Sequence, residues 1–225
     1  MTFEFREYPD REMLAMDLAN QIAGELRAAL SHDKRVALAV PGGTSPGPVF
    51  DTLCAADLNW SGVDVLLTDE RWVPETSERS NTRLLRDRLL VNRARAAGYL
   101  PLYSDAGPAE ACLDNLAEAI RPVLPLAVVL LGMGADKHTA SLFPGADRLD
   151  EALDDDAPIL LPMRAPGAAE PRITLTAPVL AGAMRKHVLI FGAEKRAALE
   201  GARGMSPKEA PINAVLDDAV VHWAE

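Results

Sequence analysis

Four short runs of β-favouring apolar residues recur along the chain, and each is followed at once by a glycine-rich or charged motif. The runs are continuously apolar rather than alternating, which is typical of strands covered on both faces. Helical stretches lie between them, and this alternation predicts an α/β fold with a mainly parallel sheet, helices on both faces and right-handed crossovers. The predicted strands are Val36–Val40, Val63–Thr68, Leu126–Leu131 and His187–Phe191, with Ala219–Trp223 as a further terminal strand. The predicted helices are Arg11–Leu30, Pro48–Ala55, Asn81–Val91, Pro108–Val123 and Glu194–Ala202.

The length and the spacing of these elements bound the domain organisation. A chain of 225 residues is long enough to bury a core without disulfide or metal staples. We find no internal repeat and no low-complexity linker, so we expect residues 1–225 to form one α/β domain. The stretch Asp147–Pro171 breaks the rhythm, and we expect its acidic run at 154–156 to be a solvated loop.

The charge and the cysteine content exclude several classes of protein. The net charge is −10, from 23 basic and 33 acidic residues, which disfavours a nucleic-acid-binding protein or a cationic membrane-surface protein. Cys54 and Cys112 belong to no metal-spaced cluster, so we expect free thiols in a reducing compartment. The N-terminal segment lacks an apolar signal region, and no apolar run approaches the ~20 residues that span a bilayer. We therefore expect a cytoplasmic protein with no membrane partner.

The four motifs are predicted to meet. In an open parallel sheet the carboxyl ends of the strands share one edge, and ligands bind in the crevice beyond that edge. Because the protein is acidic overall, a site for an anion there must gather its cations locally. The motifs are PGGTSP at 41–46, DERWVP at 69–74, GMGADKHTASLFPG at 132–145 and GAEK at 192–195.

The first motif has the character of an anion-binding loop. Gly42 and Gly43 allow an anion to approach the backbone N–H groups, Thr44 and Ser45 add hydroxyl donors, and a helix start follows. The segment at 43–47 also matches G-x-S-x-G, so a serine-hydrolase elbow is an alternative. Two features count against it: the residue after Ser45 is a proline, which has no N–H for an oxyanion, and only the nominal pair Asp217 and His222 follows.

The third motif supplies the candidate general base. His138 follows a strand end among polar residues, and its reference pKa of about 6.5 leaves it mostly neutral near pH 7, so it could take a proton from water. Asp136, two residues earlier, could orient the imidazole. A dinucleotide-binding loop is the alternative, but Lys137 occupies its third glycine position and Pro144 opposes a long helix afterwards. His32, His187 and His222 lack such a setting, and we expect them to be structural.

Three cations are candidates for binding the anion. Arg71 follows a strand end, where Asp69 or Glu70 could hold its guanidinium as a fixed fork for phosphate or carboxylate. Lys195 stands at the start of a predicted helix, where the helix dipole disfavours a cation unless an anion is bound nearby. Arg172, in PRITLT at 171–176, is the third candidate.

Taken together and in this order, the motifs resemble those of the 6-phosphogluconolactonase family, within the wider group that includes glucosamine-6-phosphate deaminases. The resemblance runs from PGGTSP to PINAVL at 211–216, which is most of the chain. Its most specific parts are DERWVP with Ser80 and Asn81, and HTASLFPG at 138–145. It implies a Rossmann-like α/β domain and hydrolysis of 6-phospho-D-glucono-1,5-lactone in the oxidative pentose phosphate pathway, with no metal and no cofactor.

By position, the resemblance makes His138 the catalytic histidine. It implies that the glycine loop at 42–45 and the cations Arg71, Arg172 and Lys195 line the sugar-phosphate site, with Asp69 beside them. The chain departs from the family at two places. Lys137 takes the place of the glycine in the usual D-G-H motif, and Pro41 replaces the small residue that commonly precedes the glycine pair. Lys137 therefore implies either a different loop backbone or an added cation at the pocket.

Two other functions stay open on the sequence. One is a glucosamine-6-phosphate deaminase or isomerase, although such relatives typically carry a tyrosine where this chain has Arg71. The other is a non-catalytic sugar-phosphate sensor, although no DNA-binding or oligomerising appendage is recognisable. The expected partner in the favoured case is a small sugar-phosphate lactone, and we expect a monomer or a small homo-oligomer.

Overall fold

The computed structural model describes residues 2–166 and 168–225 and contains two sheets. The large sheet has seven strands in the order β1-β10-β9-β6-β2-β3-β5, and every neighbouring pair in it is parallel. The predicted parallel α/β fold is therefore confirmed. Its strands are β1 (Glu4–Glu7), β2 (Val36–Val40), β3 (Val63–Leu67), β5 (Gly98–Leu100), β6 (Val128–Gly132), β9 (Lys186–Phe191) and β10 (Val220–Ala224).

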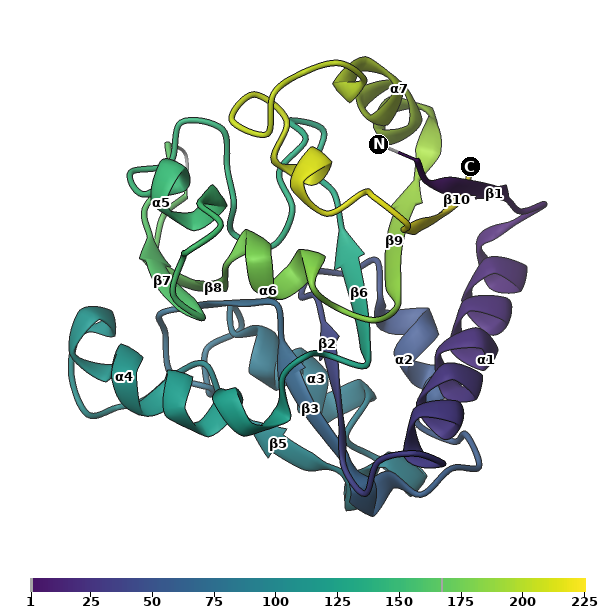
Figure 1. Ribbon diagram of the computed structural model, residues 1–225. Coiled ribbons are helices and arrows are strands. Elements are labelled where there is room, and N and C mark those ends of the chain that lie inside the picture. The colour runs from purple at the N-terminus through teal and green to yellow at the C-terminus, as the bar shows by residue number, and fades with distance from the viewer. Residues whose placement is uncertain (1, 167) are drawn as a thin grey trace.

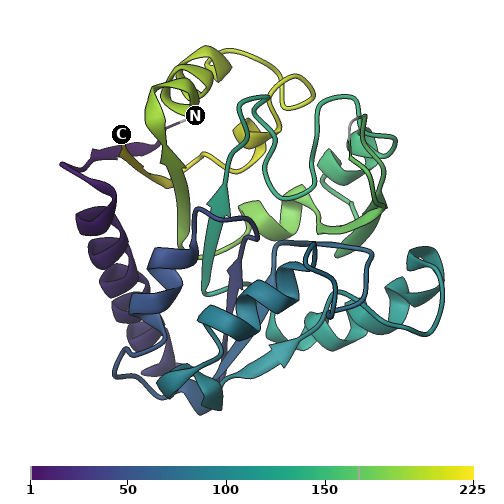
Figure 2. The same cartoon turned by 180° about the vertical axis from the view of Figure 1, so that it is seen from behind.

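Helices cover both faces of this sheet. In Figure 1, α4 and α6 lie in front of the strands, and in the reverse view of Figure 2, α2 and α3 lie in front of them. The continuous apolar runs are explained by this double cover, since every residue of β2 and β3 is buried. The helices are α1 (Arg11–Leu30), α2 (Gly47–Leu53), α3 (Asn81–Arg88), α4 (Ala109–Ile120), α5 (Leu149–Leu153), α6 (Ala177–Ala181) and α7 (Gly192–Ala202). Four 3-10 helices are η1 (Trp60–Gly62), η2 (Asn92–Ala96), η3 (Arg121–Val123) and η4 (Pro211–Ala214).

The long helix α1 has the bounds and the buried stripe expected from the sequence. Leu14, Leu18, Ile22 and Leu26 are all fully buried. The Asp10 side chain caps its N-terminus by accepting a hydrogen bond from Met13 N at 2.8 Å. The other predicted strands and helices are present with shifts at their ends, mostly of one to three residues.

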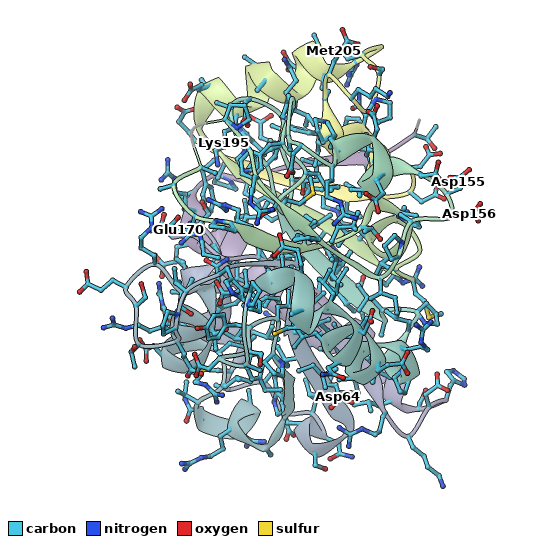
Figure 3. All side chains as sticks on the ribbon, turned by 90° about the vertical axis from the view of Figure 1, so that its left-hand side faces the viewer. Asp64, Asp155, Asp156, Glu170, Lys195 and Met205 are labelled. Carbon is cyan, nitrogen blue, oxygen red and sulfur yellow. The ribbon has the colours of Figure 1, made fainter. Side chains whose placement is uncertain are left out.

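A second, antiparallel sheet was not predicted. It has the order β4-β8-β7, with β4 (Asp69–Arg71), β7 (Leu160–Met163) and β8 (Arg172–Leu175). The DERWVP motif therefore begins as a strand rather than a loop. The stretch expected to be irregular, Asp147–Pro171, contains α5 and β7, although the acidic run at 154–156 is an exposed loop as predicted. Figure 3 shows Asp155 and Asp156 projecting at the edge of the molecule.

Two buried histidines join α1 to the sheet. His187 on β9 lies with Nε2 2.8 Å from Glu25 Oε2 and with Nδ1 3.0 Å from His222 Nε2. His222 on β10 in turn has Nδ1 2.9 Å from the hydroxyl of Tyr8. Both histidines are structural, as the sequence predicted.

The free energy of unfolding is expected to decrease as the pH falls below about 6.5, because of His222. Burial, followed by the nearby charges of His187 and Arg6, lowers the pKa of His222 from 6.5 to about 3. Between these values the unfolded chain binds a proton that the folded protein excludes. The loss therefore begins at the unfolded pKa and continues down to the folded one, at up to ~1.4 kcal/mol per pH unit.

Urea unfolding of the wild type and of His222→Asn at several pH values between about 5 and 7 checks this expectation, since carboxyl groups titrate mainly below about pH 4.5. The wild type should lose stability across this range more steeply than the variant. Equal slopes in the two proteins would contradict the assignment.

Candidate active site

The predicted motifs come together at the point where the strand order reverses. From β2 the chain continues to β3 on one side, and β6 returns to the other side of β2, so the loops after β2 and β6 diverge and leave a crevice. A cavity of about 280 Å³ lies there, close to the lower end of small-ligand sites, roughly 300 Å³. Of the predicted site residues, all except Asp136 line it: Gly42, Gly43, Thr44, Ser45, Asp69, Arg71, His138, Arg172 and Lys195.

The loop after β2 forms one wall of the cavity. Gly43 has φ +83°, a backbone conformation that glycine adopts without strain, and an added Cβ there would meet nothing within 4 Å. Gly42 is needed for a different reason: a Cβ at this position would lie 2.0 Å from Asn81 Oδ1. The two glycines therefore leave the backbone open to the cavity and allow Asn81 to pack against it.

The loop after β6 orients His138. Its Nδ1 lies 2.6 Å from Asp136 Oδ1, and its backbone N–H donates to the same oxygen at 3.2 Å. Because an ionised carboxylate only accepts hydrogen bonds, this contact favours a proton on Nδ1 and a free lone pair on Nε2. Asp136 thus touches the imidazole from outside the cavity wall, and His138, 31% exposed at its side chain, keeps contact with solvent.

Hydrogen bonds on both sides of His138 fix the course of this loop. Thr139 Oγ1 donates to Gly132 O at 2.8 Å, and Ser141 Oγ donates to the buried Asp69 at 2.6 Å. Lys137 has φ +70°, the left-handed region that favours the glycine usual in the family. Lys137 therefore adopts the left-handed backbone conformation expected of a glycine at this position, so the loop does not take a different course. Lys137 also adds no cation to the pocket, since it is not among the residues that line the cavity.

Replacing Gly134 with alanine is expected to displace the His138–Asp136 pair. A Cβ at Gly134 would lie 2.3 Å from His138 Nδ1 and 2.5 Å from Asp136 Oδ1. If His138 is the base, a displacement of about 1 Å can lower kcat by about 10²-fold. The measurement is kcat on the lactone that the resemblance implies as substrate, with Gly201→Ala in α7 as the control, because an added Cβ there meets nothing within 4 Å. Wild-type kcat in Gly134→Ala would show that the pair tolerates the intrusion.

Two arginines face each other across β4 and β8. Arg71 and Arg172 are direct partners in the antiparallel register, where like charges are destabilising. The Nε atoms of both are buried, and neither has a hydrogen-bond partner among the described residues. The prediction that Asp69 or Glu70 holds the Arg71 guanidinium was wrong: Arg71 Nη1 donates to Arg79 O at 2.6 Å, while Asp69 lies 3.5 Å from Arg172 Nη1. The arrangement is suited to an anion that neutralises the pair.

The electrostatics of Arg172 agree with this interpretation. Burial lowers its pKa, Asp69 opposes that effect, and the charge of Arg71 lowers the pKa further. The guanidinium also stands 5.2 Å from the centre of the Phe143 ring, and the His138 ring is 4.1 Å from the same ring. Phe143 thus contacts both the candidate base and a candidate anion-binding group.

The third cation comes from another part of the fold. Lys195, labelled in Figure 3, belongs to the first turns of α7, which begins at Gly192, two residues earlier than predicted. Its side chain lines the same cavity as the two arginines. Four motifs that are distant in sequence thus contribute to one site.

Asn81 is a cavity residue that the sequence did not indicate. In the sequence it stood out only as part of a motif, but it lines the cavity, and its Nδ2 donates to Asp69 O at 3.0 Å. Ser80 is the N-cap of α3, since its Oγ accepts from Arg83 N at 3.3 Å. The only signal for Asn81 in the sequence is its place after a serine at a helix start.

The alternative sites weighed from the sequence find little support. His222 hydrogen-bonds to His187 and Tyr8, not to Ser45, so it does not complete a serine triad. After β6 the first helix is the short α5, so the loop at 132–145 lacks the adjoining helix of a dinucleotide site. Cys54 and Cys112 are free, as predicted, and both are buried.

The described residues contain neither a metal-binding cluster nor a membrane-spanning helix. Across residues 2–166 and 168–225, no group of three or more His, Cys, Asp or Glu side chains is arranged to hold a metal ion. In the same ranges, no helix has both the length and the apolar character that crossing a bilayer requires.

Comparison with known proteins decides the family. Residues 9–223 match the family described as "Glucosamine-6-phosphate isomerases/6-phosphogluconolactonase". The chain belongs to this family. A protein of Mesorhizobium japonicum named 6-phosphogluconolactonase is 43% identical over 99% of this chain and 96% of its own length. A protein of Rhizobium meliloti with the same name is 39% identical over the full length of both chains.

Solved structures agree with the family assignment. The crystal structure of a 6-phosphogluconolactonase from Shewanella baltica is 33% identical and has a TM-score of 0.95 over 100% of this chain and 98% of that one. Because the two folds match over the whole length, the strands whose loops form the cavity are arranged alike in both proteins.

Proposed function

We propose that the protein hydrolyses 6-phospho-D-glucono-1,5-lactone to 6-phospho-D-gluconate, the function expected from the sequence. The names of its relatives support this activity. The observation that carries the proposal is the cross-strand pair Arg71 and Arg172, which faces the same cavity as an oriented histidine. A phosphate group would relieve the repulsion within the pair, and His138 would stand beside the rest of the sugar.

In the proposed mechanism, the phosphate docks among the cations and the N–H groups of the glycine loop. His138 Nε2 removes a proton from water, and the resulting hydroxide attacks the C1 carbonyl of the lactone. Asp136 stabilises the imidazolium that forms. A positioned base of this kind contributes roughly 10²–10⁴-fold.

The second half of the reaction opens the ring. A cavity cation or N–H group stabilises the oxyanion on C1, a contribution of about 10²–10³-fold. The C1–O bond to the ring oxygen then breaks, and protonated His138, directly or through a water, returns its proton to that oxygen. Ring opening leaves a carboxylic acid and a free hydroxyl, and the acid then releases its proton to solvent to give the carboxylate. The protons balance in this way without a covalent nucleophile or a cofactor.

The remaining expectations follow from this proposal. Asp69 and Lys195 would contact the sugar phosphate together with the two arginines, and the protein would act as one domain over residues 1–225. A cytoplasmic location and a monomer or small homo-oligomer remain predictions from the sequence.

The experiment is a substrate panel with the purified protein. Fresh 6-phosphoglucono-1,5-lactone should be hydrolysed well above its spontaneous rate, with and without a chelator, and glucosamine 6-phosphate should not be turned over. Turnover of glucosamine 6-phosphate without lactonase activity would instead identify a deaminase or isomerase. Binding of 6-phosphogluconate with no hydrolysis of the lactone would identify a sensor.

A further inference from the structure

Glu70 is a fully buried carboxylate that the proposed mechanism does not use. It lies on β4, between the cavity residues Asp69 and Arg71, and its side chain is 0% exposed. No arginine, lysine or histidine in the described part of the chain forms an ion pair with it. A buried charge of this kind is retained only when hydrogen bonds satisfy it.

Five donors satisfy this carboxylate. Oε1 accepts from Arg71 N at 2.7 Å and from Asn81 N at 2.8 Å. Oε2 accepts from Ser80 Oγ at 3.1 Å and from Thr82 N and Oγ1 at 2.7 and 2.8 Å. Asn81 and Thr82 are the first residues of α3, whose N–H groups have no partner inside the helix. Glu70 therefore caps α3 from a neighbouring strand.

The same bonds fix two residues of the cavity wall. Arg71 and Asn81 are the two ends of the segment 71–81, and Glu70 joins these ends by accepting a hydrogen bond from the backbone N–H group of each. Both residues line the cavity. At one end, Arg71 Nη1 donates to Arg79 O within this segment. At the other, the side chain of Asn81 packs against Gly42 so closely that a Cβ there would overlap it.

We propose that Glu70 is a positioning residue: its buried carboxylate, through five hydrogen bonds, holds Arg71 of β4 and Asn81 of α3 in place and so sets the affinity for the phosphorylated end of the substrate. This rests on the proposed function for the identity of the ligand. Glu70 itself does not touch the ligand, because Arg71, Asn81 and Thr82 surround its oxygens.

A carboxylate is required because each of its oxygens faces at least one backbone N–H group, which can only donate. Glutamine at this position would present one oxygen and an NH₂ group, and the NH₂ group would face a backbone N–H donor whichever way the amide is turned. Glu70→Gln keeps the shape of the side chain. It therefore weakens the hydrogen bonds that hold Arg71 and Asn81 without opening a cavity.

The test compares two substrates, 6-phosphoglucono-1,5-lactone and unphosphorylated glucono-1,5-lactone. The quantity compared is kcat/KM for the phosphorylated lactone divided by kcat/KM for the unphosphorylated lactone. This ratio does not depend on the fraction of active enzyme, so a general loss of stability leaves it unchanged. Glu70→Gln should raise KM for the phosphorylated lactone at least tenfold with less than a threefold change in kcat, and lower the ratio accordingly. Tyr99→Phe is the matched control, because its hydroxyl contacts only the outer end of this network, at Thr82 Oγ1, 2.6 Å away.

A double variant tests whether Glu70 acts through Arg71. Arg71→Ala alone should lower the same ratio, and adding Glu70→Gln should lower it by less than threefold more. If Glu70→Gln does not fold, Glu70→Asp, which keeps the charge but shortens the reach, should shift the ratio in the same direction.

The outcomes are distinguishable. A wild-type ratio in a folded Glu70→Gln or Glu70→Asp variant would overturn the inference, and full additivity with Arg71→Ala would overturn the part of it that runs through Arg71. A wild-type protein that does not hydrolyse the phosphorylated lactone would overturn the proposed function instead.

Discussion

Replacing His138 with alanine is expected to reduce kcat for the phosphorylated lactone by roughly 10²–10⁴-fold and to change KM little. The imidazole is the only group that the account assigns to removing a proton from water, and its Nδ1 is held by Asp136 at 2.6 Å. Hydrogen bonds from Thr139 and Ser141 hold the loop on the far side of His138, so the fold should survive the change.

The matched control for this prediction is His32→Ala, which removes an exposed histidine that precedes β2, whereas the cavity loop follows that strand. Initial rates are compared after subtraction of spontaneous hydrolysis, and circular dichroism checks that both variants are folded. A folded His138→Ala protein with near-normal kcat would remove His138 as the base.

Replacing Arg71 with alanine is expected to raise KM for the phosphorylated lactone by roughly 10–100-fold, the range of one charge-assisted hydrogen bond of about 1.5–3 kcal/mol. The unphosphorylated lactone should be affected much less. Stability in the absence of ligand should change little, because the variant loses the bond to Arg79 O but also the repulsion across the strands from Arg172.

Arg83→Ala is the control for charge. It removes an arginine of α3 that is 45% exposed, lies 3.9 Å from Asp87 and does not line the cavity. Both variants are assayed on the two lactones. Equal KM values for Arg71→Ala and the wild type would show that the phosphate binds elsewhere in the cavity or that Arg172 and Lys195 suffice.

Five of the seven strands of the large sheet were predictable because their signals are local, whereas the edge strands β1 and β5 were not predicted. Val36–Val40 is a continuous apolar run between a polar turn and a glycine pair, and its bounds match β2 residue for residue. The stripe of Leu14, Leu18, Ile22 and Leu26 likewise fixed the face that α1 buries. Parallel strands then placed the loops after β2, β6 and β9 on one edge, so the location of the site followed from the fold class.

The small sheet was not predictable because its signals are not local. β4 is Asp-Glu-Arg, three charged residues without a β-favouring pattern, and it becomes a strand by pairing with Arg172–Leu175 far along the chain. β7 contains Pro162, which argues against a strand in the sequence. The facing arginines depend on that pairing, and the cap of α3 by Glu70 depends on how β4 packs against the helix. Neither contact could be predicted from the sequence.

A crystal structure of the complex with 6-phosphogluconate would show where the product binds. We expect the phosphate to contact at least one of Arg71, Arg172 and Lys195, and the C1 carboxylate to lie about 2.6–3.2 Å from His138 Nε2 or one water away. A product molecule bound outside this cavity, or bound within it with the carboxylate remote from His138, would rule out the proposed mechanism.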